Sequence, residues 1–484
     1  MATGDTQPEV TVATAKPVVD ESVPLVLVSG ATGYVATHTI QKLLISGNYR
    51  VRGTIRSLKN EEKVKPLQEL VPDAKYPLEL CEADLQDKEN WISAVKGCKY
   101  VLHIASPFPL STPKNPEEVI RPAVDGTLNV LSACAESGTV KRVVLTSSIA
   151  SISCGLAGHP GRQNNTYSEE DWSPPEACEP YERSKTLAEK AAWDFMKDLS
   201  EEKKFELVVV NPAVILGPIL TKFTGTSVDI IKSVLAGEVP GVVDISMGVV
   251  DVRDVAQAHI TAMEKPECNG KRHLLVSESA VPYQRICQVM NNEFVPQGYK
   301  AAGKMKIPKF VAWFLSMFNS QVKAAYPNIG KSVIYNTDRM TNVLGIQPQV
   351  ADKMIIETAY SLIEFGLIAK TPQYHGPGGK PEAKAGEDKK DDIKPPATEG
   401  SPADDQTKPE EGKENTDEPH KDEQSQPEEK KATAEESYKE EQEDDTQKDK
   451  TDEKEDNSQK HETVVTKDDS QEDETEEKES KATD

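Results

Sequence analysis

Runs of apolar, β-branched residues alternate along the chain with segments whose apolar residues recur every three to four positions. The run "VPLVLVSG" (residues 23–30) predicts a buried strand, and "YVATHTIQKLLISG" (residues 34–47) has helical spacing and a glycine stop. The alternation continues through "YRVRGTIR", "LKNEEKVKPLQEL", "YPLELCEADL", "DKENWISAVKG", "KYVLHIAS", a long helical segment and "KRVVLTSS". Continuous apolar strands separated by helices are typical of an α/β fold, with a doubly wound parallel sheet covered on both faces.

The regular alternation of predicted strands and helices becomes less regular after Gly217. Helical patterns around residues 226–236, 282–293 and 351–366 alternate there with short strands such as "RHLLVS". We therefore expect one folded domain over residues 23–368. Its sheet core covers about 23–217, and a smaller C-terminal substrate lobe covers about 218–368.

Charge separates this domain from the rest of the chain. The 484 residues carry a net charge of −24, but residues 371–484 alone hold 18 Lys+Arg and 39 Asp+Glu, a balance of −21. Residues 1–370 therefore carry only −3. Because the tail has two aromatic residues, it buries too little apolar surface to offset an ordering entropy of ~1–2 kcal/mol per residue.

We predict disorder for residues 369–484 and for the polar segment 1–22. The tail has two possible interpretations: a solvated, self-repelling segment without a partner, or a segment that binds a protein or cations. The N-terminus shows no signal-peptide pattern, and no stretch reaches the ~18 apolar residues of a membrane span. A cytoplasmic protein without a membrane span is the expectation.

Several classes of chemistry find no support in the sequence. The seven cysteines are scattered without a CxxC motif, and the eight histidines show no metal-ligand spacing, so no metal site is predicted. No basic patch with interleaved aromatic residues indicates nucleic-acid binding. The oligomeric state is left open.

A small-residue turn follows the first predicted strand. In "SGATGYVATH", Gly30 permits a tight turn, Gly33 allows a pyrophosphate to approach the backbone, and Ala36 is small enough for close helix–strand packing. The N-terminus of the following helix would face the phosphates. This arrangement, after the first strand of an α/β chain, is typical of the Rossmann dinucleotide-binding fold.

The end of the second strand bears on which dinucleotide binds. Folds that prefer NAD place an acid there to hold the ribose 2′-hydroxyl. Here the strand ends in "RVRGTIRSLK", where Arg56 and the later Lys63 suit a 2′-phosphate. The sequence therefore favours NADP(H) over NAD(H). The alternative is that these two residues are ordinary solvated surface cations.

The stretch "PYERSKTLAEK" (residues 180–190) contains Tyr181 with Lys185 four residues later. At this spacing the two side chains share one helix face. We expect the ammonium of Lys185 to lower the pKa of Tyr181, which would make the phenol a usable proton donor. Thr146, Ser147 and Ser148 end the preceding strand, at the sheet edge where ligands bind. An ordinary solvent-exposed Tyr/Lys pair is the alternative.

As a set, these motifs resemble the extended short-chain dehydrogenase/reductases, and within them the dihydroflavonol-4-reductase-like group. The resemblance covers about residues 23–368 through "VSGATGYVATH", "ADL", "LHIASP", "GTLNVL", "VVLTSS", "YERSKTLAE", "NPAVILGP" and "VDVRDVAQAH". It implies a catalytic triad of Ser148, Tyr181 and Lys185. It implies cofactor contacts from the following residues: Gly30, Thr32, Gly33, Tyr34, Val35, Arg56, Lys63, Asp84, Leu85, Ile104, Ala105, Ser106, Tyr181, Lys185, Pro212, Ala213, Val214, Ile215 and Ser227.

One departure bears on the substrate. Plant flavonoid reductases of this group carry a substrate-contacting asparagine where this chain has Ser153, which argues against a flavonoid. The resemblance implies an NADP-dependent oxidoreductase that reduces a small ketone or aldehyde, or oxidises the alcohol, by hydride transfer. Two alternatives are an NAD-dependent enzyme like the 3β-hydroxysteroid dehydrogenases, and a nucleotide-sensing scaffold without turnover that acts through its acidic tail.

Overall fold

The structure is a computed structural model, and it describes residues 20–107, 115–156, 165–239, 241–300, 302–303, 305–317 and 326–379. Its contacts divide the chain into two units, residues 1–388 and 389–484. All the described residues belong to the first unit. The predicted disordered segments fall mostly outside these ranges.

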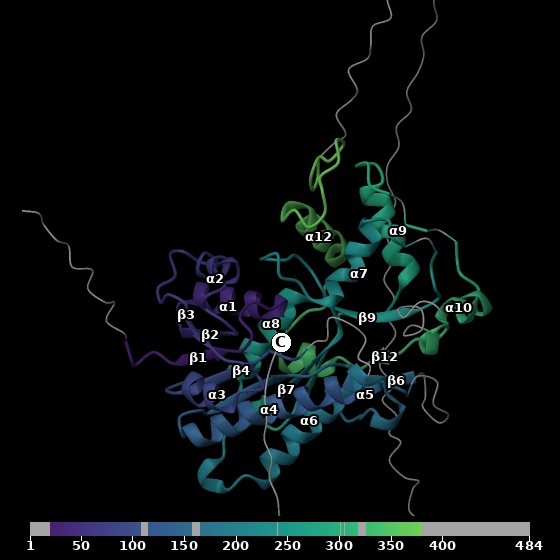
Figure 1. Ribbon diagram of the computed structural model, residues 1–484. Helices are drawn as coiled ribbons and strands as arrows, with labels where there is room; N and C mark the ends of the chain where they lie inside the picture. Colours follow the sequence, from purple (N-terminus) through teal and green to yellow (C-terminus); the bar gives the residue numbers. More distant parts are fainter. Residues whose placement is uncertain are drawn as a thin grey trace, which may run out of the picture. The chain divides into compact units, whose positions relative to one another are not determined.

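A seven-stranded parallel sheet forms the centre of the first unit, as the alternating pattern predicted (Figure 1). Its strands, in spatial order, are β10 (Arg272–Leu275), β7 (Glu206–Pro212), β5 (Arg142–Thr146), β4 (Tyr100–His103), β1 (Leu25–Val28), β2 (Arg50–Ile55) and β3 (Glu79–Glu82). The strand order reverses at β1, which pairs with β2 on one side and β4 on the other. Ligands of open α/β sheets bind beyond the carboxyl ends of the strands at such a reversal.

Helices cover both faces of this sheet. One face carries α3 (Lys88–Val95), α4 (Glu117–Ser137) and α6 (Pro180–Asp198), and the other carries α1 (Tyr34–Ser46) and α8 (Val252–Glu264). Strand β1 serves both layers, because alternate side chains of a strand point to opposite faces. Leu25 and Leu27 pack in the cluster below α4, while Val26 and Val28 pack in the cluster with α1.

The lobe beyond β7 is built around a three-stranded sheet. Its strands, in spatial order, are β11 (Glu278–Pro282), β9 (Ser246–Asp251) and β8 (Val214–Leu216). A two-stranded sheet pairs β12 (Ile334–Tyr335) with β6 (Thr166–Tyr167). The remaining helices are α2 (Glu61–Gln68), α5 (Ala150–Ser153), α7 (Thr226–Leu235), α9 (Tyr283–Phe294), α10 (Lys309–Ser316) and α12 (Ala351–Glu364).

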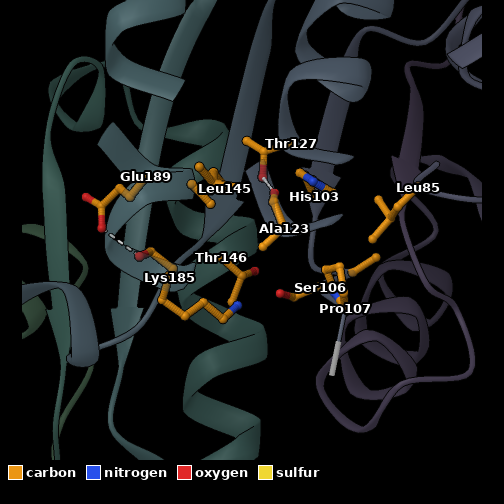
Figure 2. A pocket seen from close by; sticks show the side chains of 13 residues that line it. Leu85, His103, Ser106, Pro107, Ala123, Thr127, Leu145, Thr146, Lys185 and Glu189 are labelled. Atoms are coloured by element: carbon orange, nitrogen blue, oxygen red, sulfur yellow. Dashed lines mark hydrogen bonds between the residues drawn. The ribbon is translucent and has the colours of Figure 1, made fainter. Parts of the chain in front are cut away.

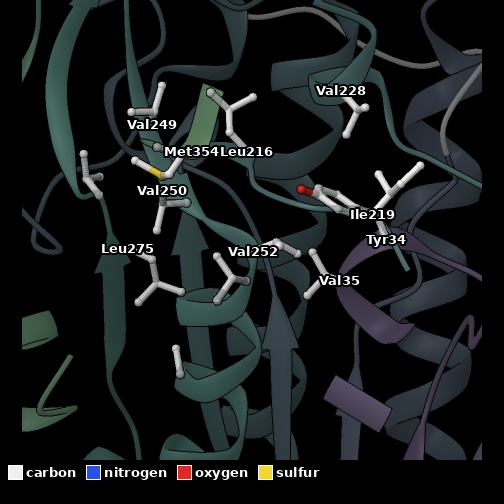
Figure 3. Close-up of a cluster of buried hydrophobic side chains, with 14 of the residues drawn as sticks. Tyr34, Val35, Leu216, Ile219, Val228, Val249, Val250, Val252, Leu275 and Met354 are labelled. Atoms are coloured by element: carbon white, nitrogen blue, oxygen red, sulfur yellow. The ribbon is translucent and has the colours of Figure 1, made fainter. Parts of the chain in front are cut away.

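One hydrophobic cluster joins the lobe to the sheet. Val35 of α1 and Leu275 of β10 belong to the same buried cluster as Leu216, Val249 and Met354 of the lobe, part of which is drawn in Figure 3. Each fully buried aliphatic side chain of this kind contributes about 1.5–3 kcal/mol. The two predicted parts therefore share a core.

The packed chain extends past the predicted boundary at residue 368. Tyr374 donates a hydrogen bond to Glu364 over 2.6 Å, and its ring packs against Tyr299 and Tyr360. Residues 369–379, which the composition assigned to the tail, thus lie on the lobe. The charge and composition of the whole tail did not predict this short packed stretch around Tyr374.

Candidate active site

The turn after β1 has the geometry that its glycines predicted. Gly30 has a φ of 65°, a left-handed conformation that favours glycine. A Cβ atom at Gly30 would lie 3.0 Å from the Cβ of Ala105 in the loop after β4. Gly33 is the N-cap of α1 and provides no side-chain cap, so the first-turn N–H groups stay available to an anion.

The predicted cofactor contacts Thr32, Tyr34 and Val35 differ in how deeply their side chains are buried. Thr32 is half-buried in the turn itself, but Tyr34 and Val35 are buried. The Tyr34 hydroxyl donates a 2.6 Å hydrogen bond to the carbonyl of Gly217, and burial raises its pKa well above the usual value. The side chains of Tyr34 and Val35 therefore support the turn from beneath, and only their backbone can face a ligand.

Arg56 and Lys63 lie beside the same edge of the sheet. Arg56 is exposed directly after β2, and no ion pair is found for it within the described residues. Lys63 lies in the first turn of α2, with its Nζ 5.2 Å from the centre of the Phe223 ring. Arg56 thus remains available to a phosphate, while Lys63 already has an aromatic neighbour.

The segment after β3 is held by its own hydrogen bonds. The Asp84 carboxylate accepts from the backbone N–H of Gln86, and the Leu85 carbonyl accepts from Asn129 over 2.8 Å. A Cβ atom at Gly126 would lie 2.9 Å from the Leu85 Cβ. Asn129 therefore has a supporting role: it fixes the backbone at Leu85 against α4.

The loop after β4 holds Ile104, Ala105 and Ser106. The Ser29 hydroxyl lies 2.9 Å from Nδ1 of buried His103 and accepts from the N–H of Ala105 over 2.8 Å. Burial lowers the pKa of His103 to about 3, so its ring is neutral. These contacts tie the β1 and β4 loops together at the reversal point.

The structure brings Tyr181 and Ser148 into contact. Their side chains share a hydrogen bond, and Ser148 also accepts from the N–H of Ala150 over 3.1 Å. Pro180 begins α6, where its missing N–H costs nothing. Ser147 points elsewhere and donates to buried Glu189 over 2.6 Å, so the two adjacent serines have different partners.

The expected pKa shift of Tyr181 is wrong in direction. Burial, followed by the negative charge of Glu182, raises the pKa of Tyr181 to about 12. Lys185 is itself buried, and this desolvation lowers its own pKa to about 8, against a raising effect of Glu189. The spacing of two residues along a helix does not predict how deeply each side chain is buried, and burial decides the direction of these pKa shifts.

Lys185 lines a narrow pocket between the carboxyl ends of β4 and β5 and the helices α4 and α6 (Figure 2). Of the predicted cofactor residues, Leu85, Ala105 and Ser106 also line it, and the pocket encloses about 330 Å³ of empty space, counted out to open solvent. The other polar residues of its lining are His103, Thr127, Thr146, Ser147 and Glu189. Tyr181 and Ser148 lie outside this lining.

Four of the remaining predicted contacts, in residues 212–215, lie where the seven-stranded and three-stranded sheets meet. Pro212 ends β7, Ala213 is buried, and Val214 and Ile215 begin β8. The N–H of Ile149 donates to the carbonyl of Pro212 over 3.1 Å, which places this corner beside the Ser148 segment. Ser227 lies in the first turn of α7 and does not line the pocket.

A buried polar network beneath the pocket was not predicted. Glu189 follows Lys185 by one turn and pairs with Arg272 of β10, whose Nε lies 2.5 Å from the carboxylate. Ser151 and Asn211 also donate to Glu189, over 2.6 and 2.9 Å. The i, i+4 spacing of Lys185 and Glu189 was visible in the sequence, but the distant partner Arg272 was not.

We expect Glu189→Ala to lower the free energy of unfolding by about 3–5 kcal/mol, because it leaves the buried guanidinium of Arg272 without a carboxylate. Urea titration of the full chain measures this change. Glu170→Ala is the matched control, since Glu170 is exposed and its ion pair with half-buried Arg339 lies at the surface, where such pairs contribute ~0–1 kcal/mol. Equal losses in the two variants would contradict the role given to Glu189.

Within the part of the chain that the structure describes, no helix has both the length and the apolar composition that crossing a bilayer requires. Within the same ranges, no cluster of three or more His, Cys, Asp and Glu side chains is arranged to hold a metal ion.

The chain is similar in sequence and structure to several reductases. It is 38% identical over 270 residues to a cinnamoyl-CoA reductase of Medicago truncatula, a match covering 55% of this chain and 79% of the relative. It is 34% identical over 254 residues to a dihydroflavonol 4-reductase of Hordeum vulgare, covering 51% and 69%. The crystal structure of Gre2 from Candida albicans in complex with NADPH matches with a TM-score of 0.57 and 29% identity, covering 71% of this chain and 99% of that one.

The relation is also visible at the level of a family model, whose match spans residues 26–276, from β1 through β10. The resemblance to extended short-chain reductases and to the dihydroflavonol-4-reductase-like group is confirmed. The chain belongs to the NAD dependent epimerase/dehydratase family.

Proposed function

We propose that the protein is an NADP(H)-dependent reductase of a small ketone or aldehyde. The observation that carries this proposal is the hydrogen bond between Tyr181 and Ser148 at the carboxyl edge of β5, with Lys185 one turn further along α6. Two relatives of known structure, Gre2 of Candida albicans and yeast methylglyoxal/isovaleraldehyde reductase Gre2, were crystallised with NADPH.

The residues of the β1 turn fit a dinucleotide. The left-handed Gly30, the uncapped start of α1 at Gly33 and the exposed Arg56 together offer backbone donors and a cation to phosphate groups. NADPH, when bound, supplies the hydride. Arg56 would hold the 2′-phosphate, and Lys185 would hold the nicotinamide ribose.

Tyr181 and Ser148 would act on the substrate oxygen. Because its pKa is raised to about 12, Tyr181 keeps its proton at neutral pH and can donate it as negative charge develops on the carbonyl oxygen. Ser148 would donate a second hydrogen bond to the same oxygen, as an oxyanion-type contact. A raised pKa suits reduction better than oxidation, because oxidation needs the phenolate.

The test is the loss of NADPH absorbance when the purified chain meets a panel of ketones and aldehydes. The proposal expects turnover with at least one of them, and tighter binding of NADPH than of NADH. Preference for NAD with oxidation of a sterol would favour the hydroxysteroid alternative. Absence of NADPH binding in a direct titration would overturn the proposal.

The cofactor preference is expected to depend on Arg56. Replacing Arg56 with glutamate removes a charge-assisted hydrogen bond of about 1.5–3 kcal/mol and places an acid where NAD enzymes carry one. The ratio of kcat/KM for NADPH to that for NADH should fall by about tenfold or more. Lys59→Glu, an exposed change nearby, is the control and should leave the ratio unchanged. An unaltered ratio in Arg56→Glu would mean that another group binds the phosphate.

A further inference from the structure

Helix α10 presents an apolar face to solvent. Phe310 is 74% exposed, and Trp313 and Met317 are each 54% exposed. Phe310 and Trp313 are at i and i+3 and so share one side of the helix, and Met317 follows directly after the helix ends at Ser316. Buried Ala312 lies on another side. A surface helix ordinarily buries its apolar stripe, so this helix has the reverse orientation.

The start of this helix is fixed to the lobe. The N–H of Val242 donates to the carbonyl of Met305 over 3.0 Å, and the N–H of Ile307 donates to Val242 over 2.8 Å. Ile307 packs against Gly241, where an added Cβ atom would lie 2.8 Å from the Ile307 side chain. Met305 itself is 73% exposed, beside the start of the helix. Figure 1 shows α10 at the rim of the first unit.

The sequence around α10 is purely basic. Between Glu293 and Asp338 the chain has six lysines and no aspartate or glutamate, within a protein of net charge −24. Four of these lysines are described and exposed, and no ion pair is found for them within the described ranges: Lys300, Lys306, Lys309 and Lys331. Apolar side chains and cations are therefore presented together.

We propose that this α10 surface, made of Met305, Phe310, Trp313 and Met317 with Lys306 and Lys309, docks onto an anionic lipid membrane surface. Such a surface offers hydrocarbon to the apolar side chains and phosphate or carboxylate charge to the lysines. Tryptophan suits the boundary, because its ring is apolar and its N–H is polar.

Two other occupants match only half of the surface. A second copy docked face to face would bring lysines against lysines. The chain's own acidic tail would pair with the lysines but has two aromatic residues in 371–484 to cover the apolar face. Side chains exposed by more than half on a single helix also protrude, whereas a groove for a peptide is concave.

The full chain is tested by co-sedimentation with large vesicles of phosphatidylcholine alone, and of phosphatidylcholine with about a third phosphatidylserine. The proposal expects binding to the anionic vesicles that weakens as salt is raised. The double variants Phe310→Ser/Trp313→Ser and Lys306→Glu/Lys309→Glu should each bind the anionic vesicles at least about tenfold more weakly.

Matched controls change exposed residues elsewhere. Ile45→Ser, at 67% exposure on α1, and Lys65→Glu on α2 should bind like the unaltered chain. NADPH binding by each variant reports that the fold is intact and does not depend on the α10 surface. No binding of the unaltered chain to anionic vesicles, or equal binding by all variants, would overturn the proposal. A dimer that Phe310→Ser/Trp313→Ser dissociates, with no vesicle binding, would assign the face to a second copy instead.

Discussion

Replacing Tyr181 with phenylalanine is expected to lower the turnover of a carbonyl substrate by about 10²–10⁴-fold while NADPH binding persists. Phenylalanine keeps the ring and its packing but removes the hydroxyl that shares a hydrogen bond with Ser148. The developing alkoxide would then have no proton donor, and Ser148 would lose one neighbour. Steady-state kinetics with the best substrate of the carbonyl panel measures the loss in kcat, and a fluorescence titration measures NADPH affinity.

The control for this change is Tyr100→Phe. Tyr100 begins β4, at the amino edge of the sheet and away from the proposed site, and its ring packs edge-on against Tyr49. Its removal of a hydroxyl should leave kcat unchanged. If Tyr181→Phe retained the turnover of the unaltered chain, proton transfer would have to come from another group and the proposed role would be wrong.

Acidification is expected to destabilise the protein steeply below about pH 6.5. Four buried histidines have pKa values that burial lowers: His103 to about 3, and His38, His259 and His273 to about 4. Between these values and ~6.5 the unfolded chain binds protons that the folded chain does not. Stability is therefore full above pH 6.5 and is lost as pH falls, by about 2 kcal/mol for each histidine at pH 5.

Three carboxylates oppose this trend. Burial raises the pKa of Asp254 to about 6 and also raises the pKa values of Glu169 and Glu182, so protonation of these groups stabilises the folded chain as pH falls. For Asp254 the gain is about 1.4 kcal/mol at pH 5, which is less than the loss from one histidine. The net loss is a large part of the ~5–15 kcal/mol that a folded domain usually has.

Urea midpoints at a series of pH values measure this effect. His273→Leu removes one buried titrating ring from β10 with a side chain of similar size, and it should flatten the decline between pH 6.5 and 5 by about one histidine's share, ~2 kcal/mol. A midpoint that stays constant over this range in the unaltered chain would contradict the assignment of neutral buried rings.

The sequence pattern located the parts of the candidate site that are local in the chain. Gly30, the Ser148 strand end and the Tyr181/Lys185 helix could all be found, because a βα turn and an i, i+4 pair are short-range features. The direction of the Tyr181 pKa shift could not, because it depends on burial by residues that come together only in the fold. The same holds for Glu189 and Arg272, which are 83 positions apart.

The C-terminal boundary of the folded domain was predicted too early for a different reason. Composition averages over many residues, and the residues from 369 onward share the polar character of the tail. Tyr374 nevertheless packs on Tyr299 and Tyr360, and Thr371 donates a hydrogen bond to the carbonyl of Gln297. The net charge of a segment of about a hundred residues does not reveal a short packed stretch of this kind.

The buried Glu189–Arg272 pair has a consequence for how the chain is made. During synthesis α6 leaves the ribosome well before β10, so Glu189 has no guanidinium partner until the later strand emerges. The other six strands of the sheet and α6 are then made before the seventh strand, β10. Ribosome-bound chains stalled before and after β10 emerges should therefore differ sharply in resistance to protease, and the nascent enzyme closes its last strand and its charge pair in one late step.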